Sequence, residues 1–291
     1  MTPAHQGHLA MLLFSGLVAG SFPLGAAAAN DIAPLALNTV RFGLAACVIG
    51  VAVALRGGVP RAALAAPWRY PLLGGVFAIY FVLMFEGLKT AAPVSAAAVF
   101  TLTPAMAAGF GWLLLRQRMT RRIALALGLG ASGALWVIFR GDLSALLAFE
   151  VGRGEEVYFI GCVAHALYTP LVRRLNRGES ALVFTFGTLI AGAIVMGIVG
   201  APAVLATDWA NLPGRVWVAI GYTGIAASAG TFVLLQFATL RLPSAKVMAY
   251  TYLVPAWVTV WSLALGFAAP PLGILIGVAL TVAGLVILLR D

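Results

Sequence analysis

The sequence predicts an all-α integral membrane protein of ten transmembrane helices, arranged as two inverted five-helix repeats around a central cavity. Three observations carry this prediction: the composition, the length of the apolar segments and an internal repeat. Of the 291 residues, 62% are hydrophobic and 9% are charged, whereas a soluble domain carries about 25% charged residues. Such a chain cannot cover its apolar residues with a charged surface, so lipid is the expected solvent.

The apolar residues form blocks of about twenty, the length that a helix needs to cross a hydrocarbon layer of ~30 Å. We expect spans at 8–28, 34–54, 68–88, 92–114, 122–139, 154–173, 180–200, 214–238, 244–267 and 272–290. No hydrophilic stretch between them is long enough for a separate domain. The first block follows no basic n-region, so we expect no cleaved signal peptide.

The basic residues indicate how these spans are oriented. With the amino terminus in the cytoplasm, thirteen arginines and lysines fall in inner loops or termini and four fall in outer loops. Short loops rich in Lys and Arg stay on the cytoplasmic side, where anionic lipid attracts them. The sequence therefore predicts a multi-pass protein of the bacterial inner membrane with both termini in the cytoplasm. The formal charge of +9 needs no nucleic acid to explain it.

The chain matches itself at an offset of 151 residues. Pro104 then meets Pro255 and Gly133 meets Gly284, so that TLTPA in the fourth span lies over YLVPA in the ninth. Chance matching of sequence rich in Ala, Leu and Gly is the alternative, which the matched prolines oppose. Five spans make one unit, so the second unit enters the membrane upside down, and transporters commonly bind substrate between such halves. The repeats are expected at 1–146 and 147–291.

One stretch of each half resembles the EamA-type repeat of the drug/metabolite transporter superfamily. In the first half it is FEGLKTAAPVSAAAVFTLTPAMAAGFGWLLL, followed by ALGLGASGALWVI. In the second half it is LLQFATLRLPSAKVMAYTYLVPAWVTVWSLALGF, followed by LGILIGVALTVAGLVILL. The resemblance covers essentially the whole chain and implies a ten-helix secondary transporter that works by alternating access. The chain departs from the family pattern after the fourth and ninth spans, where many relatives have Gly-Glu and this chain has Leu115-Arg116 and Gly266-Phe267.

The chain is most similar to the bacterial branch of this superfamily that exports aromatic and other hydrophobic amino acids, so the resemblance implies this substrate class. One alternative is an efflux carrier for drugs or nucleotide-sugar-like metabolites. Cationic drugs favour a buried carboxylate, and nucleotides favour several deep cations, of which the spans offer only Arg41. An alternative of another class is a membrane-embedded enzyme or scaffold.

The sequence lacks GxxxxGK[ST], HExxH and paired CxxC motifs, so ATP hydrolysis and metal catalysis lack their usual parts. We expect no enzyme, no catalytic residue, no metal and no cofactor. The expected partners are a small-molecule substrate and membrane lipid, in a monomer or weak homodimer.

Polar side chains inside a span are costly unless they face a cavity. His165 is the deepest ionisable group, and Tyr158, His165 and Thr169 share one face of the sixth span, with Tyr168 adjacent. Such a face suits an amphipathic zwitterion with a flat ring, and the alternative is a histidine bonded to a backbone carbonyl. The other side chains expected to line the cavity are Tyr80, Tyr250, Tyr252, Ser21, Asn38, Arg41, Thr101, Ser228 and Thr231.

Four prolines each remove a helix hydrogen bond and can bend their spans. Their symmetric placement predicts paired hinges, with static kinks for packing as the alternative. They are Pro23, Pro104, Pro170 and Pro255. Glu86 and Lys89, three residues apart at the end of the third span, predict an ion pair at the interface.

Overall fold

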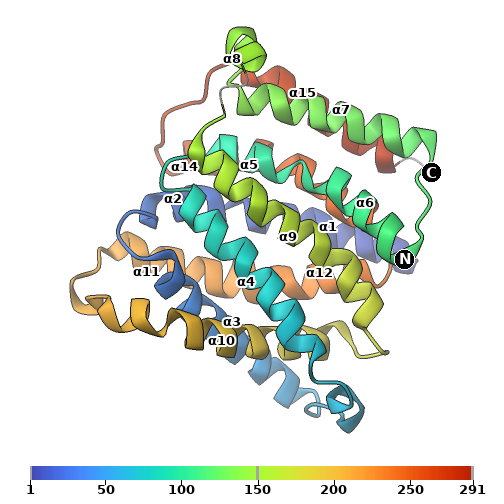
Figure 1. Ribbon diagram of the computed structural model, residues 1–291, viewed down its shortest axis with the longest axis vertical. Coiled ribbons are helices and arrows are strands. Elements are labelled where there is room, and N and C mark those ends of the chain that lie inside the picture. The colour runs from blue at the N-terminus through green and yellow to red at the C-terminus, as the bar shows by residue number, and fades with distance from the viewer. Residues whose placement is uncertain (1, 149–150, 290–291) are drawn as a thin grey trace.

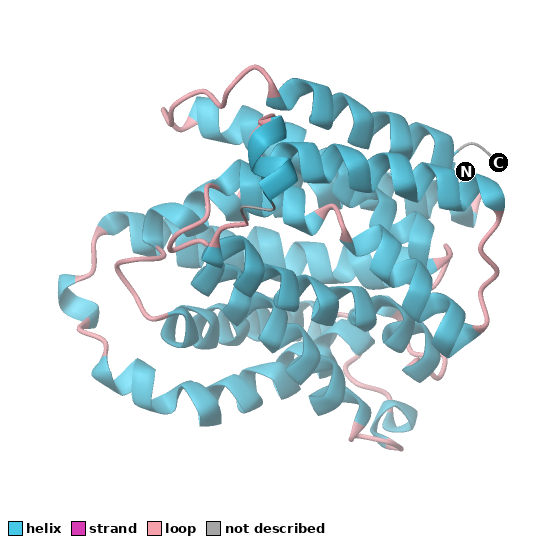
Figure 2. Ribbon diagram, turned by 45° about the horizontal axis from the view of Figure 1, so that its top comes forward, coloured by secondary structure: helices cyan, strands magenta, loops and turns pink. Residues whose placement is uncertain are grey.

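The computed structural model describes residues 2–148 and 151–289, and every regular element within those ranges is a helix (Figure 2). Ten rods of helix cross the molecule, six of them continuous and four broken. The continuous rods are α3 (Pro34–Leu55), α4 (Arg69–Gly87), α7 (Arg121–Ile138), α9 (Arg153–Leu175), α10 (Ala181–Ala206) and α15 (Ile274–Leu289).

The broken rods join two helices through a short irregular turn. They are α1 with α2 (Pro3–Ala19, Ser21–Ala28), α5 with α6 (Pro93–Phe100, Thr103–Leu115), α11 with α12 (Gly214–Gly224, Thr231–Thr239) and α13 with α14 (Ser244–Ala249, Val254–Ala264). A π-helical turn, η3 (Ile225–Gly230), joins α11 to α12, and a 3₁₀ turn, η4 (Tyr250–Leu253), joins α13 to α14. The short elements outside the rods are η1 (Arg61–Leu64), α8 (Leu143–Ala148) and η2 (Trp209–Asn211).

Eight rods are long and apolar enough to cross a membrane. The other two are α15, an apolar helix of only 16 residues, and α9, which has 23 residues but charged side chains in its first and last turns. The prediction of an all-helical, multi-pass membrane protein is confirmed. Its largest errors in the span ends are at α1, which begins at Pro3 because Thr2 caps it, and at α10, which continues to Ala206.

The first and sixth rods run in opposite directions through the bundle. Gly7 near the start of α1 lies against Leu242, and Arg173 near the end of α9 donates a hydrogen bond to the carbonyl oxygen of the same Leu242. The start of one rod therefore meets the end of the other, which is the relation that inversion of two halves requires. Figure 1 shows α9 crossing the face of the molecule beside α4.

The molecule has two ends that the rest of the description uses. The α4 end holds the start of α4, the end of α9 and the ends of α3 and α12, while the α11 end holds the starts of α11 and α3 and the end of α10. In Figure 1 the α11 end lies at the left. Each end gathers segments from both halves of the chain.

Two of the four predicted hinge prolines lie at helix breaks. Pro104 and Pro255 are each the second residue of the second helix of a broken rod, and proline is well tolerated in the first turn of a helix. The two breaks are neighbours, because the hydroxyls of Thr103 and Thr251 are 3.3 Å apart. Pro23 lies in α2 just after the break at Gly20, and Pro170 lies inside the continuous α9. Movement at these prolines stays a prediction.

Candidate functional site

The polar face of α9 is turned into the molecule. Tyr158, His165, Tyr168 and Thr169 are all buried, with exposed fractions of 0 to 1%. The hydroxyl of Tyr158 lies 3.1 Å from that of Tyr80 on α4. The structure thus brings together the α9 residues and Tyr80 that the sequence selected.

The His165 imidazole is surrounded by aromatic rings. Its centroid lies 4.4 Å from that of Tyr80, 5.0 Å from that of Phe100 and 5.1 Å from that of Phe77. Its Nδ1 atom has no hydrogen-bond partner among the described residues. The bond to a backbone carbonyl, which was the alternative reading of this histidine, is therefore not made at Nδ1.

Tyr168 and Thr169 form hydrogen bonds with two other rods of the second half, to which α9 itself belongs. The Tyr168 hydroxyl accepts a hydrogen bond of 2.9 Å from Nε2 of Gln236 on α12. The Thr169 hydroxyl donates to the sulfur of Met248 on α13, at 3.3 Å. Gln236 was not selected from the sequence, although a buried amide in an apolar span is the same kind of signal as His165.

Arg41 is fully buried on α3 and reaches toward the π-helical turn. Its Nε donates to the Ser228 hydroxyl at 2.7 Å, and its Nη2 donates to the Ala227 carbonyl at 3.1 Å. The guanidinium carbon lies 3.6 Å from the centroid of the Phe81 ring. Nη1 has no partner, and none of the ion pairs formed within residues 2–148 and 151–289 includes Arg41. Arg41 does not snorkel to the surface, because its neutral partners lie inside the bundle.

The remaining small polar residues that the sequence selected are buried as well. Asn38 donates through Nδ2 to the carbonyl oxygens of Pro34 and Phe81, and its Oδ1 has no partner within the described chain. Thr231 and Thr101 donate to carbonyls of their own helices. The Ser21 hydroxyl is buried without a described partner. The threonines are therefore satisfied locally, whereas Asn38 and Ser21 keep free hydrogen-bonding capacity.

Two predicted tyrosines lie apart from this cluster. Tyr252 packs with Leu127 and Leu285, and its hydroxyl donates to the Leu127 carbonyl at 3.4 Å. Tyr250 pairs through its hydroxyl with Nδ1 of His8, at 3.1 Å. Regular helical spacing along the ninth span could not show this, because both tyrosines lie in the 3₁₀ turn η4.

The cluster is closed in this conformation. Rings of Phe77, Phe81, Phe100 and Phe232 fill the space between α4, α9 and α12, where the sequence led us to expect an open cavity. An open cavity of about 700 Å³ lies instead at the α4 end, between the ends of α3 and α12 and the start of α10. Arg56, Glu179 and Arg241 are among its lining residues.

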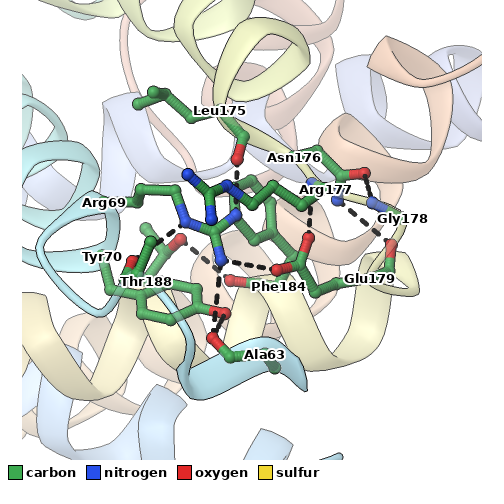
Figure 3. Close-up of polar contacts among 11 residues, drawn as sticks. Ala63, Arg69, Tyr70, Leu175, Asn176, Arg177, Gly178, Glu179, Phe184 and Thr188 are labelled. Atoms are coloured by element: carbon green, nitrogen blue, oxygen red, sulfur yellow. Dashed lines mark hydrogen bonds and ion pairs between the residues drawn. The ribbon is translucent and has the colours of Figure 1, made fainter. Parts of the chain in front are cut away.

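Two buried contacts of charged side chains near the ends of the rods were not predicted from the sequence. Arg69 and Glu179 form a buried ion pair of 2.6 Å (Figure 3). Glu155, in the first turn of α9, is 6% exposed and accepts a hydrogen bond of 2.6 Å from the Ser95 hydroxyl. The Glu86–Lys89 ion pair, which was predicted, is present at 2.7 Å.

No cluster of three or more His, Cys, Asp or Glu side chains suited to a metal ion occurs in the part of the chain that the structure describes. Cys47 and Cys162 are free thiols. The side chains of the buried cluster offer aromatic contact, one cation and a few neutral hydrogen-bonding atoms.

The sequence profile of the EamA-like transporter family matches residues 5–139 and again 153–290. Among curated proteins, the chain is similar to the uncharacterized transporter YyaM of Bacillus subtilis (strain 168), with 27% identity over 262 residues, 89% of this chain and 86% of that protein. It also resembles a protein crystal structure at 23% identity, with a TM-score of 0.74 over 99% of this chain and 97% of the other. At that identity the likeness concerns the fold alone.

Proposed function

Because the chain belongs to the EamA-like transporter family, we propose that it is a secondary carrier that exports small amphipathic metabolites, aromatic or other hydrophobic amino acids in particular. It works without ATP and by alternating access between the two sides of the membrane. We place it in the bacterial inner membrane with both termini in the cytoplasm, since the basic loop residues favour that orientation.

The single observation that supports this substrate class is the buried cluster between α3, α4 and α9. Aromatic rings contact the His165 imidazole and the Arg41 guanidinium. Three buried polar atoms lack partners within the described residues, namely Nη1 of Arg41, Nδ1 of His165 and Oδ1 of Asn38. Leaving a buried polar atom unpaired costs about 1–3 kcal/mol. A ligand with an aromatic ring and complementary polar groups removes that cost when it binds.

In this proposal each part of the substrate has a partner of suitable chemistry. The carboxylate pairs with Arg41, whose planar fork suits two parallel hydrogen bonds. The ring replaces contacts among Phe77, Tyr80 and Phe100. Asn38 and His165 accept or donate hydrogen bonds to the amino group and carboxylate. The threonines, Ser21, Ser228, Tyr158 and Tyr168 shape the surrounding wall.

The charged groups favour this substrate over the alternatives. The charged side chains buried in the described chain are those of Arg41, Arg69, Glu155 and Glu179. Glu155 is bonded to Ser95 near a helix start, so it offers little to a cationic drug at mid-depth. Arg69 is already paired with Glu179, which leaves a single cation, too few for a nucleotide diphosphate.

Counterflow of labelled phenylalanine in proteoliposomes tests the proposal. Vesicles loaded with unlabelled phenylalanine should accumulate label transiently when the protein is present, and empty vesicles should not. A panel of other amino acids as internal substrate then ranks the specificity. Absence of counterflow for every member of a broad amino-acid panel would remove the substrate assignment.

A further inference from the structure

A buried ion pair fastens the two halves of the chain together at the α4 end (Figure 3). Arg69, the first residue of α4, donates through Nη2 to Oε1 of Glu179 at 2.6 Å. Its Nη1 donates to the Leu175 carbonyl at 2.5 Å, and its Nε donates to the Ala66 carbonyl at 2.9 Å. Arg69 is 1% exposed and Glu179 is 6% exposed. The start of α4 is thereby held to the loop between α9 and α10.

A second ion pair joins the two halves at the α11 end. Arg215, in the first turn of α11, donates through Nε and Nη2 to the two oxygens of Asp31, at 2.5 and 2.8 Å. Asp31 lies in the loop between α2 and α3. This pair has good bidentate geometry but is open to solvent, since Arg215 is 58% exposed and Asp31 is 20% exposed.

The two pairs occupy equivalent places in the two halves. In each, the acid lies in the loop between the first and second rods of one half, and the arginine begins the third rod of the other half. Glu179 follows Asp31 by 148 positions and Arg215 follows Arg69 by 146. These offsets are close to the 147 positions between Pro23 and Pro170 and the 151 between Pro104 and Pro255. The chain therefore has two equivalent ion pairs at opposite ends of the molecule, of which one is buried and the other is exposed.

We propose that these two pairs are equivalent latches of the transport cycle. The Arg69–Glu179 latch, buried, holds the α4 end in its present conformation, and the Asp31–Arg215 latch is the one that becomes buried when the molecule changes to its opposite-facing conformation. The proposal rests on alternating access as stated under the proposed function. Inverted repeats exchange the conformations of their two halves in such a cycle, so equivalent pairs exchange their exposure.

Each ion pair stabilises the conformation in which that pair is buried. Breaking an exposed ion pair has little effect, whereas removing one partner of a buried pair leaves an uncompensated charge. Glu179→Gln should therefore destabilise the present conformation selectively. Asp31→Asn should have its main effect on the opposite-facing conformation, in which that pair is buried. The two substitutions should shift the equilibrium in opposite directions.

Cysteine labelling measures this shift without any substrate. In a background with Cys47→Ser and Cys162→Ala, one reporter is A63C, which is 1% exposed and whose carbonyl lies beneath Arg69 at the α4 end. The other reporter is A33C, which is exposed beside Asp31 at the α11 end. Maleimide labelling rates are compared in reconstituted full-length protein, with gel filtration to confirm that each variant is folded.

Glu179→Gln should raise the labelling rate of A63C about tenfold and lower that of A33C, and Asp31→Asn should do the reverse. The double variant should return toward the parent rates. Glu86→Gln, which breaks an exposed ion pair between the last turn of α4 and the loop that follows it, is the matched control and should change neither rate. Shifts of the two latch variants in the same direction, or no shift in either, would overturn the proposal. Since no amino acid is added, a wrong substrate assignment leaves this outcome unaffected.

Discussion

The imidazole of His165 on α9 lies against the ring of Tyr80 on α4, with centroids 4.4 Å apart, so that side chains from the two halves of the chain meet. His165→Ala removes this contact and the unpartnered Nδ1. We expect the initial rate of phenylalanine counterflow to fall at least tenfold, because the substrate loses both a ring contact and a hydrogen-bonding atom. The rate is measured in proteoliposomes at equal protein density.

A matched control for this variant is Ile160→Ala on the same helix. Ile160 is 60% exposed and faces away from the cluster, so its truncation should leave the rate within about twofold of the parent. Equal rates for His165→Ala and the parent, in protein that elutes normally from gel filtration, would show that the cluster does not contact substrate.

Arg41 is expected to select substrates that carry a carboxylate. In the parent protein, phenylalanine should compete with labelled phenylalanine much better than its amide does, because the amide lacks a charge to pair with the guanidinium. Arg41→Gln should abolish this preference, a change of about 1.5–3 kcal/mol for a hydrogen bond to a charged group. Competition curves for the two compounds measure it. The preference for a carboxylate should persist in Arg241→Gln. This variant changes an exposed arginine that lines the cavity of about 700 Å³ at the α4 end.

Close packing of α7 against α15 depends on glycine. A β-carbon on Gly133 would meet the Gly277 carbonyl oxygen at 2.5 Å and the Leu280 β-carbon at 2.9 Å, whereas one on Gly128 of the same helix would meet nothing within 4 Å. Gly133→Ala should therefore cost about 1–3 kcal/mol of stability, in line with overpacked cores. Gly128→Ala should not. Thermal unfolding in detergent compares them, and equal unfolding temperatures would show that the two helices adjust without cost.

The rods could be predicted from the sequence because hydropathy and length act locally. Pro34, for example, begins a helix and follows a short loop, and the span that we expected at that residue begins there. The buried position of Arg41 was also readable, since a charge inside an apolar block needs a partner or a purpose. Its partners, Ala227 and Ser228 in the π-helical turn, lie 186 and 187 residues away in the sequence. The sequence around Arg41 could not predict them.

The latch residues could not be found from the sequence for a different physical reason. Arg69 and Glu179 lie at the ends of rods, where charged side chains usually meet water or lipid headgroups, so neither is unusual on its own. Their pairing spans 110 residues. The surroundings of Tyr252 could not be predicted from its position in the ninth span, because regular helical spacing does not hold through a 3₁₀ turn.

The Arg69–Glu179 pair gives a stability that depends on pH. Burial raises the pKa of the Glu179 carboxyl, but the hydrogen bonds from Arg69 and from the Arg177 backbone N–H outweigh burial and leave the pKa below its ordinary 4.5. A lowered pKa in the folded state means that the stabilisation is complete above about pH 4.5. It is lost as the pH falls through the folded-state value, because the folded protein must then take up a proton at a cost.

Glu179→Gln should accordingly unfold at a lower temperature than the parent at pH 7, by the equivalent of about 3–5 kcal/mol for a broken buried pair. As the pH falls below 4.5 the parent should lose stability faster than the variant, so the two unfolding temperatures converge. Glu156→Gln changes an exposed carboxylate that takes part in none of the ion pairs formed within residues 2–148 and 151–289, and it should track the parent at every pH. A difference between parent and Glu179→Gln that stays constant from pH 7 to well below 4.5 would mean that the lost stability comes from packing, not from the carboxylate charge.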